Sequence, residues 1–220
     1  MNTVVLSKTY PAPPFCEKEI LRYAGCKYAS KETRALLNDC LKEIKDKLIY
    51  QVCYCELPVQ ISGDICDLAL FRVASEKLAR NLKEAEKVIL FAATVGIETD
   101  RLIAKYGRLS PAKALMFQAI GAERIEALCD VFCADIKEEY HTEALPRFSP
   151  GYGDVPLSVQ KDIFAVLEPH KKIGLTLNNS FLMSPTKSVT AFLGLGGRQK
   201  PTLNKCSNCN NLNCTFRGVS

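Results

Sequence analysis

The segment "RFSPGYGDVP", residues 147–156, carries the residue types best suited to hold a small molecule. Arg147 offers a planar guanidinium that can bind a carboxylate or phosphate through two parallel hydrogen bonds. Gly151 and Gly153 permit positive φ and a close approach to a ligand, and Tyr152 can stack on a flat ring or donate from its hydroxyl. The segment therefore fits a ligand with an acid group at one end and an aromatic ring elsewhere. The alternative is a rigid connector between helices, in which Arg147 binds carbonyl groups at a helix end.

A second group of residues has the spacing of metal ligands. The segment "KCSNCNNLNCTFR" places Cys206, Cys209 and Cys214 in a C-x2-C-x4-C pattern. Two thiolates at the first spacing can reach one metal through a tight turn, and the third leaves one coordination position for a distant cysteine, water or substrate. The pattern predicts a zinc site or an iron–sulfur cluster, with free or reactive thiols as the alternative.

Five further cysteines are expected to be buried apolar residues. Cys53, Cys55 and Cys66 are candidates for a fourth metal ligand, but free cysteine is among the most buried residue types. Cys129 and Cys133 lie one helical turn apart, which indicates a buried helix face more than a metal pair. The chain has 11 cysteines, an odd number, and no secretory signal, so we expect reduced thiols or a metal and not disulfides.

Several kinds of site are missing from the sequence. It contains no Gly-x-Gly-x-x-Gly between a strand and a helix, no Walker loop and no zincin motif. Its two histidines, His141 and His170, lie in polar segments, which favours surface positions and excludes a histidine-rich metal centre. The "GLGG" at residues 194–197 is interpreted as the exit from a strand, because no helix follows it to form an anion site.

The elements that must position residues 147–156 mix helical and strand patterns without a regular rhythm. Helices are predicted over residues 16–25, 31–50, 66–85, 109–140 and 156–167, and a further one begins after Gly96. Strands are predicted from residue 50 to Pro58, over the nearly all-apolar residues 87–96, and on either side of a turn at residues 185–187. This order favours an α+β fold over a doubly wound sheet.

Terminal residues of these helices have the expected types. Ser30 and Ser110 are predicted to be N-caps, with Pro111 at the first helical position. Gly25 and Gly107 are predicted to lie just past the ends of their helices.

The composition indicates a globular protein without a membrane span. Apolar residues make up 47% of the 220 residues and charged residues 24%. The longest apolar run is far shorter than the roughly 20 residues needed to cross a bilayer, and no secretory signal is visible, so we expect a cytoplasmic location. A net charge of +5 allows an acidic partner but gives no indication of nucleic acid. We expect a domain over residues 1–197, followed by a linker and cysteine-rich tail over residues 198–220.

Two segments together resemble the activation (reactivation) domain of cobalamin-dependent methionine synthase. The sequence Arg-x-x-x-Gly-Tyr is followed by proline, a short helix and "LTLNNSFLMSPTKSVTAFLGLG". Within it, "SFLMSP" and "SVTAFLGLG" are similar to a family segment of the form Ser-Phe-x-Met-x-Pro…Ser-Val-Ser. Upstream, "EILRYAG" and "LFAATVG" resemble the short, free-standing relatives of that domain. The resemblance extends from about Glu19 to Gly197.

This resemblance implies a twisted antiparallel sheet flanked by helices that binds S-adenosylmethionine in a shallow groove. It further implies docking over a corrinoid protein, where the methyl group and one electron restore cob(II)alamin to methylcobalamin. Arg147 and the backbone of Gly151 and Tyr152 would hold S-adenosylmethionine. Glu126, in "EALCD", would receive the ligand's ammonium or offset its sulfonium, with a solvated helix charge as the alternative.

Departures from the family pattern define the rival hypotheses. The chain has no Trp, so the family's Asp-Trp contact is missing, as is its tyrosine pair after the last shared strand. It also lacks an Asp-x-His-x-x-Gly segment, so the cobalamin would belong to a partner methionine synthase or related methyltransferase, with a separate electron donor. The chain would then be a component of methionine synthase reactivation. The alternatives are a non-catalytic docking protein for a corrinoid protein and a metal-binding electron-transfer module that uses the cysteine tail.

Overall fold

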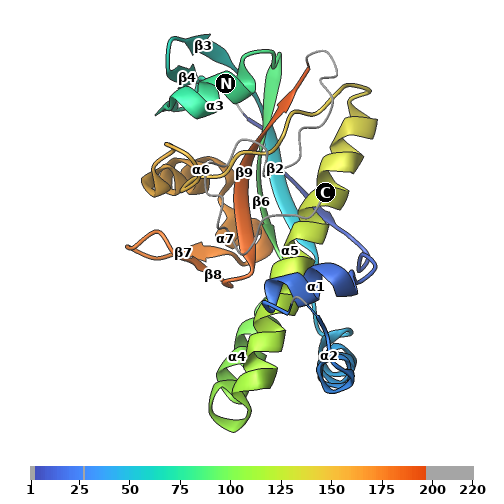
Figure 1. Cartoon of the computed structure of the whole chain (residues 1–220). Helices are drawn as coiled ribbons and strands as arrows, with labels where there is room; N and C mark the ends of the chain where they lie inside the picture. The colour runs from blue at the N-terminus through green and yellow to red at the C-terminus, as the bar shows by residue number, and fades with distance from the viewer. Residues whose placement is uncertain (1–2, 27, 197–220) are drawn as a thin grey trace.

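A four-stranded antiparallel sheet organises the chain in the computed structural model, which describes residues 3–26 and 28–196 (Figure 1). Its strands are β1 (Leu6–Thr9), β2 (Gln51–Pro58), β6 (Lys87–Thr94) and β9 (Ser188–Leu195), in the order β1–β2–β6–β9. The register places Tyr54 opposite Phe91 and Leu90 opposite Phe192. Helices lie on both sides of this sheet, so the predicted α+β class with an antiparallel sheet is confirmed.

The two central strands are apolar because both faces of the sheet are covered. Every residue of β6 after Lys87 is buried, which confirms the buried strand predicted over residues 87–96. β2 alternates as predicted: Val52 and Tyr54 pack into one hydrophobic cluster, whereas Cys53 and Cys55 pack into another on the opposite face. Strand alternation thus sorts these side chains between two cores.

Eight helical segments surround the sheet within residues 3–26 and 28–196. They are α1 (Glu17–Tyr23), α2 (Lys31–Ile44), α3 (Glu76–Leu82), α4 (Glu98–Leu109), α5 (Pro111–Glu139), the 3-10 turn η1 (Leu157–Val159), α6 (Gln160–Leu167) and α7 (Pro169–Ile173). The second half of α5 covers one face of the sheet, and α3, α6 and α7 cover the other. The first half of α5 extends past the sheet and packs with α1, α2 and α4 in a third apolar cluster (Figure 1). None of these helices is long and apolar enough to cross a membrane.

The predicted helix termini are confirmed in part. The Ser30 hydroxyl accepts a hydrogen bond from the Thr33 amide at 3.2 Å and so caps α2, as predicted. Pro111 begins α5 and Ser110 occupies its N-cap, although the Ser110 side chain makes no capping hydrogen bond. Gly107 does not end α4, which continues to Leu109; the prediction was wrong because the Ser110–Pro111 pair, and not the glycine, sets the boundary.

The helix predicted over residues 66–85 is wrong in its first half. The chain there forms a small antiparallel sheet of β3 (Gln60–Ser62), β4 (Ile65–Asp67) and β5 (Arg72–Ala74). The Asp67 carboxylate accepts hydrogen bonds from the Ala69 amide and from Arg72 Nε, and these bonds fix a turn that breaks the helical path. The helix α3 begins only after Ser75, whose hydroxyl caps it by accepting from the Leu78 amide at 3.0 Å.

Two strands flank the turn at residues 185–187 as predicted, but they do not pair with each other. β8 (Met183–Ser184) pairs with β7 (Thr176–Leu177) in a small hairpin that projects beside α6, while β9 joins the central sheet (Figure 1). The strand β7 was not predicted.

The segment after α5 covers the outer edge of β9. The Leu145 amide donates to the Gly194 carbonyl at 2.8 Å, and Phe148 and Phe192 exchange two backbone hydrogen bonds of 2.9 and 2.8 Å. This pairing satisfies an edge that would otherwise expose backbone groups. It also fixes the backbone on both sides of Arg147, the residue at which the candidate site begins.

Candidate functional site

Arg147 and two carboxylates of α5 form the centre of the candidate site. The Arg147 Nη2 donates to Glu126 Oε2 and the Nη1 to Asp130 Oδ1, both at 2.5 Å. Glu126 and Asp130 lie one turn apart on α5, so both can face the same guanidinium. The sequence predicted Glu126 and Arg147 separately, and the structure brings them into contact. The connector hypothesis predicted that Arg147 binds carbonyl groups at a helix end, whereas the hydrogen bonds from Nη1 and Nη2 go to carboxylates.

The electrostatics of this cluster keep Arg147 charged. The Arg147 side chain is 14% exposed, whereas those of Glu126 and Asp130 are 40% and 58% exposed. Burial by itself lowers the pKa of Arg147, yet the carboxylates of Glu126 and Asp130 raise that pKa above its ordinary value. The cluster carries two carboxylates for one guanidinium, and the carboxylates keep solvent-accessible oxygens.

The loop after Arg147 has the backbone that its glycines predicted. Gly151 and Gly153 both have positive φ, at 81° and 64°. The Gly151 amide donates to the Val155 carbonyl at 2.9 Å, which folds the loop back on itself. Tyr152 between the glycines is 56% exposed, and its ring meets the edge of the Phe148 ring at a centroid distance of 5.5 Å. An exposed aromatic ring in the loop that follows Arg147 is suited to stack on a flat ring of a ligand.

Sequence reasoning missed Asp154, which ties this loop to α3. Asp154 Oδ2 accepts from the backbone amides of Glu76 and Lys77 at 2.9 and 3.3 Å, and Oδ1 accepts from the Ser75 hydroxyl. The Ser75 hydrogen bond, and then the two amides, lower the pKa of Asp154 below its ordinary value. No local pattern in "GYGDVP" reveals a partner that lies far away in the sequence.

A buried ion pair, also missed from the sequence, places the N-terminal segment beside α5. Arg124 is fully buried and pairs with Glu123, and its guanidinium donates to the carbonyls of Pro13 and Pro14 at 2.5 and 2.7 Å. The Cys16 amide donates to Glu123 Oε1 at 3.2 Å, just before α1 begins. These contacts hold α1 across α5 (Figure 1), and Glu123 precedes Glu126 by three residues on that helix.

The charge of Glu126 affects the pKa of Tyr23, the last residue of α1. Burial, and then the negative charge of Glu126, raise the pKa of Tyr23 above its ordinary value, while the Arg22 guanidinium over its ring opposes this change. A residue from the N-terminal part of the chain therefore belongs to the surroundings of the cluster.

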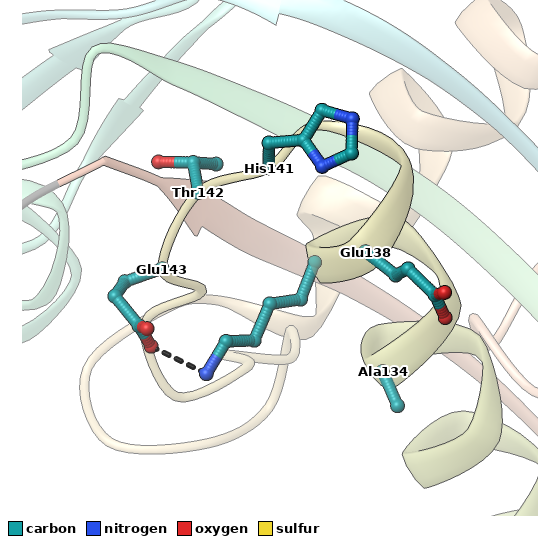
Figure 2. Close-up of a pocket in the computed structure, with 6 residues that line it drawn as sticks. Ala134, Glu138, His141, Thr142 and Glu143 are labelled. Carbon is teal, nitrogen blue, oxygen red and sulfur yellow. Dashed lines mark ion pairs between the residues drawn. The ribbon is translucent and has the colours of Figure 1, made fainter.

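A hollow of about 560 Å³ lies at the carboxyl end of α5, lined by Ala134, Lys137, Glu138, His141, Thr142 and Glu143. Figure 2 shows Glu138, His141 and Glu143 around the end of the helix. Ala134 lies one turn after Asp130, so the hollow begins one turn beyond the Arg147 cluster. Lys137 pairs with Glu143 at 2.6 Å across it. Both histidines are exposed, as predicted.

Four of the five cysteines that were expected in buried positions are core residues, and the fifth, Cys133, is only partly buried. Cys53, Cys55, Cys66 and Cys129 are all buried, and burial raises the pKa of Cys55 to about 12 and that of Cys66 to about 11. Within residues 3–26 and 28–196, no group of three or more His, Cys, Asp or Glu side chains is arranged to hold a metal ion. Cys206, Cys209 and Cys214 lie outside the described residues.

The sheet, the helices and the arginine–carboxylate cluster beside a glycine-rich loop define an α+β domain with a candidate ligand site. A match to the family described as "Vitamin B12 dependent methionine synthase, activation domain" spans residues 76–200, more than half of the chain, and the chain belongs to this family. Glu126, Arg147, Gly151 and Tyr152 lie within the matched range. The resemblance seen in the sequence is therefore confirmed.

Among solved structures, the chain is similar to the one described as "Crystal Structure of the MetH Reactivation Domain bound to AdoHcy". The TM-score is 0.65 at 17% sequence identity, and the similarity covers 90% of this chain and 80% of that chain. At this identity the similarity establishes the fold. No curated protein matches the chain.

Proposed function

We propose that this chain binds S-adenosylmethionine with Glu126, Arg147, Gly151 and Tyr152, and presents its methyl group to cobalamin on a partner methyltransferase. The Arg147–Glu126 contact carries this proposal, because it joins two residues singled out separately for the opposite charges of one methionyl group. Support also comes from the family and from the AdoHcy bound to the similar MetH reactivation domain.

The residues of the cluster fit the ligand's chemistry. A methionyl group carries a carboxylate, an ammonium and a sulfonium, and the cluster supplies one guanidinium and two partly exposed carboxylates. Arginine has five N–H donors, so Arg147 can keep its contacts to Glu126 and Asp130 and still donate to a ligand carboxylate. Glu126 would accept from the ammonium or lie near the sulfonium, and Tyr152 would stack on the adenine.

The proposed reaction needs a second protein and a reductant. The methyl–sulfur bond of S-adenosylmethionine breaks as a methyl–cobalt bond forms, and one electron from a separate donor balances the change from cob(II)alamin. This chain's residues bind and orient the methyl donor, so its contribution is positioning and electrostatics. The partner would be a corrinoid-carrying methionine synthase or related methyltransferase.

The cysteine tail provides a second, independent proposal. Cys206, Cys209 and Cys214 have ligand spacing for zinc or an iron–sulfur cluster, and a cluster would be suited to passing the electron that reactivation consumes. The proposed boundary between the ligand-binding domain and this tail lies at residues 197–198.

The test of the main proposal is titration calorimetry of S-adenosylmethionine with the full chain and with Arg147→Ala. Removing a hydrogen bond to a charged group costs about 1.5–3 kcal/mol, so we expect the affinity to fall by roughly tenfold to a hundredfold. Arg101→Ala is the matched control, since that arginine is 68% exposed and pairs locally with Glu98. Absence of saturable binding to the unmodified chain would favour the docking-protein alternative, and equal affinity in Arg147→Ala would remove Arg147 from the site.

A further inference from the structure

The loop that carries Gly151, Tyr152 and Gly153 depends on few hydrogen bonds of its own. The Gly151 amide donates to the Val155 carbonyl, and the Tyr152 and Val155 amides donate to the carbonyls of Ser149 and Tyr152. Two glycines at positive φ give such a loop many alternative conformations when nothing else restrains it. Ordering it on ligand binding would then cost affinity.

The restraint comes from Asp154, whose two carboxylate oxygens both accept hydrogen bonds from the amino end of α3. Oδ2 accepts from two backbone amides, those of Glu76 and Lys77, which have no partner within the helix. Oδ1 accepts from the Ser75 hydroxyl, and the same hydroxyl accepts from the Leu78 amide. A carboxylate is also favoured at the positive end of the helix. The anchor is thus part of the cap of α3.

Packing around Gly153 fixes the loop against the same helix. A Cβ atom added to Gly153 would come within 2.9 Å of Lys77 Cδ and 3.1 Å of Phe148 Cζ. Phe148 is in turn paired with β9 through two backbone hydrogen bonds. The loop is therefore held between α3 and the edge of the central sheet, with Tyr152 facing outward.

We propose that Asp154 is a positioning residue, which holds Gly151 and Tyr152 in their ligand-binding conformation by anchoring the loop to the amino end of α3. The identity of the ligand, S-adenosylmethionine, rests on the proposed function. The hydrogen bonds by which Asp154 anchors the loop are independent of that proposal. The lowered pKa of Asp154 means that the carboxylate form, and with it the anchor, is complete above its ordinary pKa of 3.8 and is lost only as the pH falls below that value.

The experiment compares Asp154→Ala, Asp154→Asn and the unmodified chain by calorimetry and by the amide signals of ¹⁵N-labelled glycines without ligand. We expect Asp154→Ala to weaken S-adenosylmethionine binding by up to roughly fivefold, because the stability that a capping side chain gives would have to be made up when the ligand orders the loop. Asp154→Asn keeps one acceptor oxygen, so its affinity should lie between the two. The Gly151 and Gly153 signals should shift or broaden in Asp154→Ala, while those of Gly25 and Gly174 report that the fold is intact.

Asp46→Ala is the matched control, because the Asp46 side chain is 85% exposed and remote in sequence from the loop. The proposal would be overturned if both Asp154 variants bind S-adenosylmethionine with the affinity of the unmodified chain and show unchanged Gly151 and Gly153 signals. Failure of the unmodified chain to bind S-adenosylmethionine would instead contradict the proposed function. In that case the glycine signals alone decide whether Asp154 holds the loop: a change supports the anchor and no change overturns it.

Discussion

At the scale of single residues, the site depends on partners that the sequence does not reveal. Arg147 and Glu126 were singled out as candidates from their types and from the family resemblance, whereas the contacts of Asp130 and Asp154 were not predicted. Asp130 looks like any solvated charge on a helix, and its role appears only when the segment after α5 turns back along β9. Residue types therefore indicate the chemistry of a site, while the contacts that hold it require the fold.

The buried thiols should make stability depend on pH in the alkaline range. Burial, with the nearby Cys55 adding to it, raises the pKa of Cys53 to about 12, and burial raises that of Cys55 to about 12, from an ordinary value of 9.0. A raised pKa in the folded state means that stability is complete below pH 9 and falls as the pH rises toward 12. Each thiol can reduce the free energy of unfolding by up to about 1.4 kcal/mol per pH unit.

Urea unfolding of the full chain at pH 8, 9 and 10 measures this effect, and Cys55→Ala should reduce the slope above pH 9. Cys16→Ala is the control, because Cys16 is exposed. The range stops at pH 10 because Tyr10, whose pKa is also raised above its ordinary value, begins to contribute there. An identical slope in Cys55→Ala and the unmodified chain would show that this thiol does not titrate with folding.

At the scale of elements, prediction from sequence succeeded where the apolar pattern was long. The helix over residues 109–140 was correct because its apolar residues keep helical spacing over a long segment. The strand over residues 87–96 was correct because a short, β-branched and nearly all-apolar run is typical of a strand buried on both faces. The helix over residues 66–85 failed in its first half, because the hydrogen bonds of Asp67 set a turn there. Short strands such as β7 have too few residues to show alternation.

The packing of α5 on the sheet predicts a large effect for Phe132. Its ring is fully buried and lies 4.8 Å from the Phe91 ring and 5.2 Å from the Tyr54 ring, between centroids. Phe132→Ala leaves a cavity between helix and sheet and should lower the free energy of unfolding by about 3–5 kcal/mol. Urea unfolding measures this, with Val131→Ala as the control on the exposed side of the same turn, where a change within about 0.5 kcal/mol is expected. If Phe132→Ala lowers the free energy of unfolding by less than about 1 kcal/mol, the packing of this ring between α5 and the sheet does not stabilise the fold as proposed.

At the scale of the whole molecule, the fold includes much more than the family match. That match begins at residue 76, yet β1 and β2 supply half of the central sheet, and the buried Arg124 holds the segment before α1. Composition and the order of elements predicted the α+β class, since these are properties of the entire chain. They did not predict how the N-terminal segment reaches α5, because that depends on one arginine and two backbone carbonyls far apart in the sequence.

The position at which the described fold ends leads to a prediction about the cysteine tail. β9 ends at Leu195, and the Gly196 amide donates to the Glu143 carbonyl at 3.0 Å, so a chain of residues 1–197 keeps every contact described above. We expect this shortened chain to match the full chain in its free energy of unfolding and in its affinity for S-adenosylmethionine. It should differ in metal content, because Cys206, Cys209 and Cys214 are removed.

Elemental analysis of protein purified without oxygen measures the metal, and the full chain with Cys206→Ser and Cys209→Ser is the matched variant. If the proposed tail site holds zinc or iron in the full chain, both proteins should lose that metal, since the site loses all three thiolates in one and two in the other. Metal that stays with residues 1–197 would place its ligands outside the tail. The shortened chain could lose S-adenosylmethionine binding while the double serine variant keeps it. That result would show that the tail contributes to the ligand site through residues other than these two cysteines.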